Sequence, residues 1–189
     1  MIVGSKRVDW GGLAEKLGTI TRTESGYSET GGSGIAAKLI VEIMGDQVWR
    51  DAVDFYVSGK PGAEGARSVL WMLRPPAAMN RCNEIFLTTN DYETASFAIC
   101  LLQVVADRRV LDWISQYLAS ANKGARIWGL GIVDQLLIMN EEITLNEAMP
   151  LIETGLIDPD ESVQRQARQI LEMVEGEKQL RDDKIGNPA

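Results

Sequence analysis

The sequence predicts an all-α fold in which helical hairpins stack into a short array. Two observations carry this prediction. Apolar residues recur at helical spacing along almost the whole chain, and no segment alternates convincingly as a half-buried strand does. One apolar motif also returns at steps of about thirty residues, the length of one hairpin in helical-repeat proteins. With 189 residues, of which 45% are hydrophobic, the chain can bury a continuous core.

The recurring motif is a small residue followed by large apolar residues four and seven positions later. The small residues are spaced 30, 32, 31 and 38 positions apart, at Ala36, Ala66, Ala98, Gly129 and Ala167. A second series lies between them, at Ala52, Cys82, Ile114 and Ala148. Positions four and seven apart share one helix face, and a small residue allows close approach of a neighbouring helix. Pairs of helices built this way must stack on one another, although an irregular helical bundle is the alternative.

Composition divides the chain into three parts. Residues 1–34 are expected to hold an N-terminal helix, over Val8–Leu17, and a flexible Gly/Ser loop that ends at Gly34. Residues 35–175 form the predicted helical-repeat domain. Residues 176–189 are a charged tail that we expect to be flexible.

Two helix starts in the repeat domain have recognisable caps. Thr144 and Glu147 have the spacing of a capping box, and Asp158-Pro159 places proline at the expected first position of a helix. Pro150 lies inside the helix that Thr144 should start. Because proline lacks the amide hydrogen that a helix needs, we expect a kink or an early stop there.

The last repeat resembles a known family. Ser162–Leu171 is similar to the first helix of a HEAT or armadillo-like repeat, which commonly reads Val-Arg-x-x-Ala-x-x-x-Leu after an Asp-Pro turn. In Tyr92–Val105 the match is partial, since Thr94 and Ser96 replace the valine and the arginine. The resemblance implies a short right-handed α-solenoid of about four to five HEAT-like hairpins, with the second helices on the concave side. It implies no activity, since such arrays usually serve as binding surfaces.

The composition argues against several classes of function. Nineteen basic and 27 acidic residues give a net charge of −8, which disfavours nucleic acid as a partner. The chain has no histidine, which excludes Ser-His-Asp and Cys-His catalysis and His-ligated zinc. No phosphate-binding glycine motif is present, so we expect neither an enzyme nor a cofactor or metal site. The cysteines Cys82 and Cys100 are expected to be buried, reduced thiols, and no segment is long enough for a membrane span, which together predict a cytoplasmic protein without a membrane partner.

The predicted binding site lies on the second helices of the hairpins. Their apolar stripes are expected to include Val48, Ala52 and Phe55 in the first of them, which leaves a polar stripe facing outward. This stripe carries one cation against four carboxylates, at Arg50, Asp54, Asn80, Glu84, Asp112, Gln116 and Glu147. Among the tryptophans, Trp71 is expected in the core, whereas Trp49 is predicted to be exposed and to join the binding site.

The sequence therefore favours a non-enzymatic protein-binding module with an acidic concave surface. The partner is expected to be another protein with basic character, and one concrete form is a bacterial immunity protein that neutralises a toxin domain by direct binding. Two alternatives remain open. The resemblance also covers HEAT-like chromophore lyases or chaperones, which would bind a tetrapyrrole. A structural scaffold subunit would instead expose an apolar patch.

Overall fold

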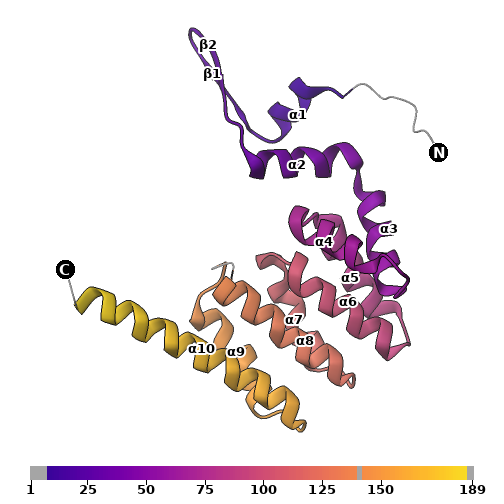
Figure 1. Ribbon diagram of the computed structural model, residues 1–189, viewed down its shortest axis with the longest axis vertical. Helices are drawn as coiled ribbons and strands as arrows, with labels where there is room; N and C mark the ends of the chain where they lie inside the picture. The colour runs from indigo at the N-terminus through magenta and orange to yellow at the C-terminus, as the bar shows by residue number, and fades with distance from the viewer. Residues whose placement is uncertain (1–7, 140–141, 187–189) are drawn as a thin grey trace.

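The computed structural model describes residues 8–139 and 142–186, and it confirms the all-α class, with 75% helix and little strand (Figure 1). A short N-terminal part holds one helix and a two-stranded hairpin. Their bounds are α1 (Trp10–Lys16), β1 (Ile20–Thr23) and β2 (Gly26–Glu29). The helices that follow are α2 (Ser33–Met44), α3 (Asp46–Val57), α4 (Ala63–Leu73), α5 (Pro76–Thr88), α6 (Tyr92–Val105), α7 (Leu111–Leu118), α8 (Lys123–Asp134), α9 (Leu145–Leu156) and α10 (Glu161–Gly186).

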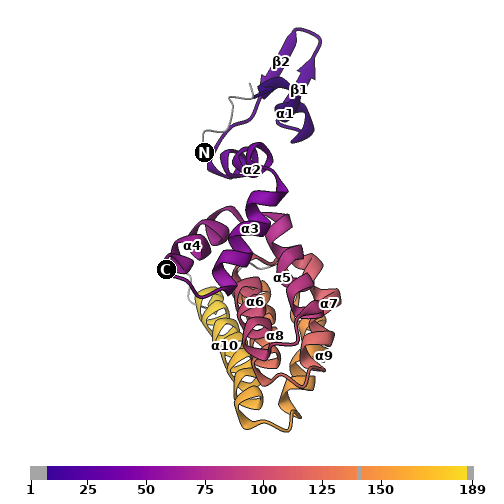
Figure 2. The ribbon, with the colours of Figure 1, turned by 90° about the vertical axis from the view of Figure 1, so that its right-hand side faces the viewer.

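Helices α3 to α10 pack as four consecutive hairpins, α3–α4, α5–α6, α7–α8 and α9–α10. The second member of each hairpin packs on the second member of the next, so that α4, α6, α8 and α10 form one row. The first members, α3, α5, α7 and α9, lie on the other side of the molecule (Figure 2). The sequence predicted them as the second helices of their hairpins, and this pairing is wrong, because α3, α5 and α7 each pack mainly on the helix that follows them. We call the face of α3, α5, α7 and α9 that points away from the core the odd-helix face.

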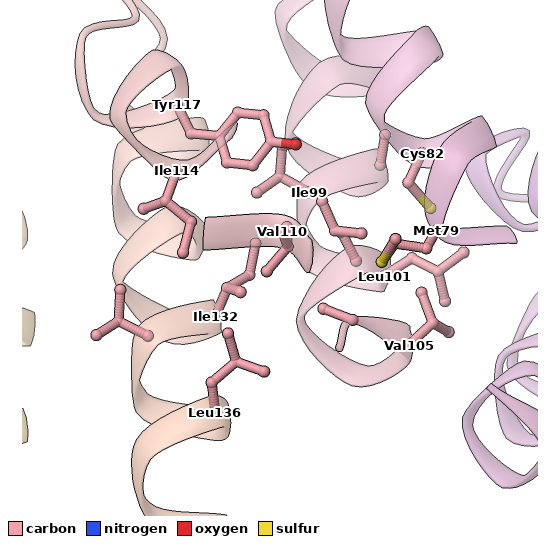
Figure 3. Close-up of a cluster of buried hydrophobic side chains, with 14 of the residues drawn as sticks. Met79, Cys82, Ile99, Leu101, Val105, Val110, Ile114, Tyr117, Ile132 and Leu136 are labelled. Carbon is pink, nitrogen blue, oxygen red and sulfur yellow. The ribbon is translucent and has the colours of Figure 1, made fainter. Parts of the chain in front are cut away.

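The core runs between the two rows. Figure 3 shows its middle, where Met79 and Cys82 from α5 meet Ile99 and Leu101 from α6, and where Tyr117 of α7 lies close by. The Tyr117 ring meets Phe86 edge-on, at 4.8 Å between ring centroids. The apolar side chains of α5, α6, α7 and α8 thus form one continuous cluster with those of α3, α9 and α10.

The five small residues of the predicted motif do not share one environment. Ala98, Gly129 and Ala167 are buried, Ala66 is half-buried and Ala36 is exposed. A Cβ atom on Gly129 would lie 3.2 Å from Cβ of Tyr117, so the small residue of α8 faces α7 of its own hairpin. The close approach of a neighbouring helix, which the small residues predicted, is therefore present at Gly129 of α8. It is absent at Ala36 of α2, which is exposed.

The N-terminal part differs from the expectation of a helix followed by a flexible loop. Strands β1 and β2 pair antiparallel, with Thr23 opposite Gly26, and β2 lies inside the segment 25–34 that was predicted as the loop. Only Ile20 among their side chains is even half-buried, so the apolar alternation that would have revealed a strand is absent. Helix α2 begins at Ser33, before the predicted domain boundary.

Four local predictions at the C-terminal end can also be judged. The capping box of Thr144 and Glu147 is present, but the early stop at Pro150 is wrong, because α9 continues to Leu156. Helix α10 starts at Glu161 rather than at Pro159, and the Asp160 carboxylate accepts a hydrogen bond from the Ser162 amide. The predicted flexible tail is helical from residue 176 as far as Gly186, and its last three residues lie outside the described part of the chain.

Candidate functional site

The predicted site begins on α3. Trp49, which was predicted to be exposed there, is buried. Trp49 is only 3% exposed, and its indole N–H donates to the Val41 carbonyl at 3.1 Å. The buried stripe of α3 consists of Trp49, Val53 and Tyr56, so the predicted stripe is displaced by one residue. Trp49 therefore anchors α3 to α2 in the interior and offers nothing to a partner.

Arg50 and Asp54 of α3 lie beside two charged residues of α5. The Arg50 guanidinium donates to both carboxylate oxygens of Glu84, at 2.8 and 2.5 Å. Arg81 donates to Asp54 at 2.7 Å and to Glu84 at 3.2 Å. We call these four residues the ion cluster. Two cations and two carboxylates make it electrically neutral, and it ties α3 to α5.

The ion cluster shifts the pKa values of Arg50, Arg81 and Glu84. The hydrogen bond from Arg50 lowers the pKa of Glu84, and the bond to Glu84 raises the pKa of Arg50. The bond to Asp54 raises the pKa of Arg81. All four side chains are partly open to solvent, so the cluster is a surface feature in which each charge already has a partner.

Between α5 and α7 the predicted polar residues do not contact one another. The Tyr117 hydroxyl donates to Asn83 at 2.8 Å, which joins the two helices beneath the surface, and burial raises the pKa of Tyr117. Asn80, Asp112 and Gln116 are exposed, and within the described residues no side-chain hydrogen bond fixes them. They are free to meet a partner.

Glu147 of α9 is committed to local structure. Its carboxylate accepts from the Thr144 backbone amide at 2.8 Å and from the Thr144 hydroxyl, and it also pairs with Arg108. These bonds, the one to the Thr144 amide first, lower the pKa of Glu147 to about 2. Glu147 thus completes a helix cap, and its charge is offset by Arg108.

The odd-helix face keeps a negative balance. Helices α3, α5, α7 and α9, with the 3-10 turn at Arg108–Val110, carry seven carboxylates and four guanidinium groups, a net charge of −3. Three of the four carboxylates of the predicted stripe, Asp54, Glu84 and Glu147, form ion pairs. Four others on these helices have no cation of the described residues within ion-pair distance, namely Asp46, Asp51, Asp112 and Glu153.

Sequence reasoning missed the two arginines that neutralise this stripe, Arg81 and Arg108. Arg81 precedes Glu84 by three residues, a spacing that allows an ion pair on one helix, and this was the available signal. Its bond to Asp54, 27 residues away, depends on how α3 packs on α5 and leaves no mark in the local sequence.

Other kinds of site find little support among the described residues. No group of three or more acidic or cysteine side chains could hold a metal ion there. Cys82 is buried and Cys100 half-buried, both are free thiols, and burial raises the pKa of each. A groove of about 680 Å³ lies between α2 and the α4–α5 turn, and its lining combines apolar residues with Lys38, Glu42 and Arg74. Across the described ranges, every helix is too short or too polar to cross a membrane.

Comparison with known proteins identifies no relative. No family model matches the chain, no curated protein is similar to it, and no solved structure matches its fold.

Proposed function

We propose that this chain is a non-enzymatic protein-binding module, a short right-handed HEAT-like solenoid that holds a basic protein on its odd-helix face. These are the helices on which the sequence places the binding site, although they come first rather than second in their hairpins. The observation that carries the proposal is the set of exposed residues Asn80, Asp112 and Gln116 on helices that, with the 3-10 turn at Arg108–Val110, carry a net charge of −3. A toxin domain of positive charge, blocked by an immunity protein, is one partner of this kind.

The neutral ion cluster supports this assignment. Arg50, Asp54, Arg81 and Glu84 satisfy one another, so they give α3 and α5 a fixed polar surface at little further cost of ordering on binding. Asp112 on the neighbouring helix α7 has no such partner among the described residues, so its charge is available to a cation of the bound protein. The expected role of Asp112 is to steer and hold the partner.

Charge reversal at Asp112 tests the proposal. The protein is used to capture partners from its native lysate, and the dissociation constant of each captured protein is measured at low and high salt. The proposal requires a basic partner whose binding weakens at least about tenfold with Asp112→Lys and weakens further with salt. Glu93→Lys on α6 is the matched control, since it changes the net charge equally on the opposite row, and it should leave the affinity almost unchanged.

Two results would refute this function. One is binding that is insensitive both to salt and to Asp112→Lys. The other is turnover of a small molecule by the purified chain, which would contradict the non-enzymatic role directly.

A structural scaffold subunit is the second candidate. Its support is the run of apolar residues that α2 leaves exposed, among them Ile40, Ile43 and Met44. Within a larger assembly such a surface would be covered. An isolated chain that binds an apolar fluorescent dye, and loses that binding only when a subunit partner is added, would favour this candidate over the basic-partner module.

A further inference from the structure

Helix α2 leaves its apolar face exposed. Eight of its twelve residues are apolar, yet none of them is buried. Ile40, Ile43 and Met44 are 45%, 41% and 49% exposed, and Ala36 is exposed too. At 100° per residue these four positions lie on one side of the helix, whereas Lys38 and Glu42 lie on the other. We call Ala36, Ile40, Ile43 and Met44 the α2 stripe.

The corresponding stripes in α6 and α8 are buried. Ala98, Leu102 and Val105 of α6 are all buried, and so are Gly129 and Val133 of α8 and Leu136, just beyond the end of α8. At Gly129 the cover is α7, the helix that precedes α8 in its hairpin. Before α2 stands the β1–β2 hairpin, which leaves the α2 stripe open.

The N-terminal helix lies on another side of α2. Lys16 pairs with Glu42, and Leu17 lines the groove together with Ala37 and Val41. Glu42 and Val41 lie about 160° and about 100° around the helix from Ile40, whereas Ala37 lies about 60° from it, so the groove borders one edge of the α2 stripe. Figure 1 shows α2 between α1 and the array of α3 to α10. The α2 stripe therefore has room for one more helix.

We propose that the α2 stripe binds the same stripe of a second copy of this chain, with the two helices antiparallel about a two-fold axis at Ile40. The stripe is complementary to itself in this arrangement. Ala36 lies four residues before Ile40 and Met44 four residues after it, so the small side chain of one copy faces the large ones, Ile43 and Met44, of the other.

Charge also favours a second copy as the occupant. The α2 stripe holds no charged side chain, so it gives a basic or an acidic partner nothing to pair with. It also brings no like charges together, despite the net charge of −8 on each chain. One two-fold contact covers both exposed stripes at once. This inference is independent of the basic-partner module, because it concerns a different face. It gives the apolar residues of α2 another occupant than the scaffold candidate does.

Sedimentation velocity and light scattering on the purified 189-residue chain test the proposal. At concentrations of up to about 100 μM the expected species is a dimer of twice 20.8 kDa. Ile40→Asp places two carboxylates at the axis, and it should raise the dimer dissociation constant about a hundredfold or more. The matched control is Leu87→Asp on α5, which is 58% exposed and should leave the dimer intact. Far-ultraviolet circular dichroism checks that both variants fold.

Two further variants separate this pairing from general apolar association. Ala36→Trp adds apolar area but blocks the close approach, so it should weaken the dimer, whereas unspecific association would become stronger. In a Cys100→Ser background, Ile40→Cys should form an intermolecular disulfide on oxidation. Ala36→Cys should not, because the two copies of position 36 would be about 12 Å apart along the helix axis.

A monomer at all these concentrations would overturn the proposal, and so would a dimer that survives Ile40→Asp or cross-links through Ala36→Cys. Asp112→Lys should leave the dimer unchanged. Failure of basic-partner binding and failure of the dimer are therefore distinguishable.

Discussion

Gly155 lies where α9 packs against both α8 and α10, and its missing side chain allows that packing. A Cβ atom there would lie 2.8 Å from Cδ1 of Leu130 and 3.0 Å from Cβ of Ala167. Gly65 is also inside a helix, α4, but it faces open space. The two glycines therefore separate the effect of close packing from that of helix propensity.

Substitution by alanine should affect the two glycines in opposite directions. Gly65→Ala should stabilise the protein by about 0.5–1 kcal/mol, because alanine is the better helix former. Gly155→Ala should destabilise it by about 1–3 kcal/mol, because overpacking of α8 and α10 outweighs the gain in propensity. Chemical denaturation measures both values. An increase in stability with Gly155→Ala would show that α9 is not packed as closely as described.

Asp134 is the residue whose charge is least well accommodated. Its Oδ1 atom is buried without a hydrogen-bond partner among the described residues, and burial raises the pKa of this carboxyl group. The folded protein therefore binds a proton here more tightly than the unfolded chain does. At neutral pH the buried charge of Asp134 therefore lowers the free energy of unfolding. This loss should disappear as the pH falls through the raised pKa, because the carboxyl group is then protonated.

Asp134→Asn should therefore stabilise the protein at pH 7 by about 0.5–1 kcal/mol, a modest value because the residue is partly exposed. The advantage over the parent chain should shrink as the solution is acidified, since protonation then removes the same charge. Thermal unfolding of both proteins between pH 7 and pH 4 provides the measurement. An advantage that grows toward acid pH would contradict this account of Asp134.

At the scale of elements, the ion cluster is the clearest link between neighbouring helices on the odd-helix face. Glu84 of α5 accepts from Arg50 of α3 and from Arg81 of its own helix, so it is the shared acceptor. Arg50 lowers the pKa of Glu84 in the folded state. The cluster therefore stabilises the fold fully above the pKa of an unfolded glutamate, and this contribution is lost as the pH falls through the lower, folded pKa.

Glu84→Gln should reduce the free energy of unfolding by about 0.5–1 kcal/mol at pH 7, a small amount because the side chains are partly solvated. The difference from the parent should fade below about pH 4 and in high salt. Glu153→Gln on α9 is the control, since no ion pair joins Glu153 to the described residues. Equal effects of the two substitutions would show that the ion cluster contributes nothing specific.

At the scale of the whole molecule, the sequence could predict the helices but only part of their orientation. Helical periodicity and the capping box at Thr144 are local, so they were read correctly. The buried stripe of α3 was not, because Val48, Ala52 and Phe55 are as apolar as Trp49, Val53 and Tyr56. The packing of α3 against α4 and α5, together with the hydrogen bond from Trp49 to the Val41 carbonyl of α2, selects between the two stripes.

The same reasoning applies to the candidate site. Asn80, Asp112 and Gln116 were correctly placed on helix surfaces, because polar residues between apolar stripes point outward. The neutralisation of Glu84 and Glu147 by arginines from neighbouring elements could not be predicted, since it depends on contacts between segments 34 and 39 residues apart. The fold class and the exposed positions follow from local patterns in the sequence. Which carboxylates form ion pairs depends on how the helices pack.

Hydrogen exchange of the protein, alone and with its captured partner, tests the central claim that the odd-helix face binds another protein. The account predicts slower exchange in peptides from α3, α5 and α7, centred on Asn80 and Asp112, and little change in α6 and α8. Protection confined to α4, α6, α8 and α10, with α5 and α7 unchanged, would contradict it.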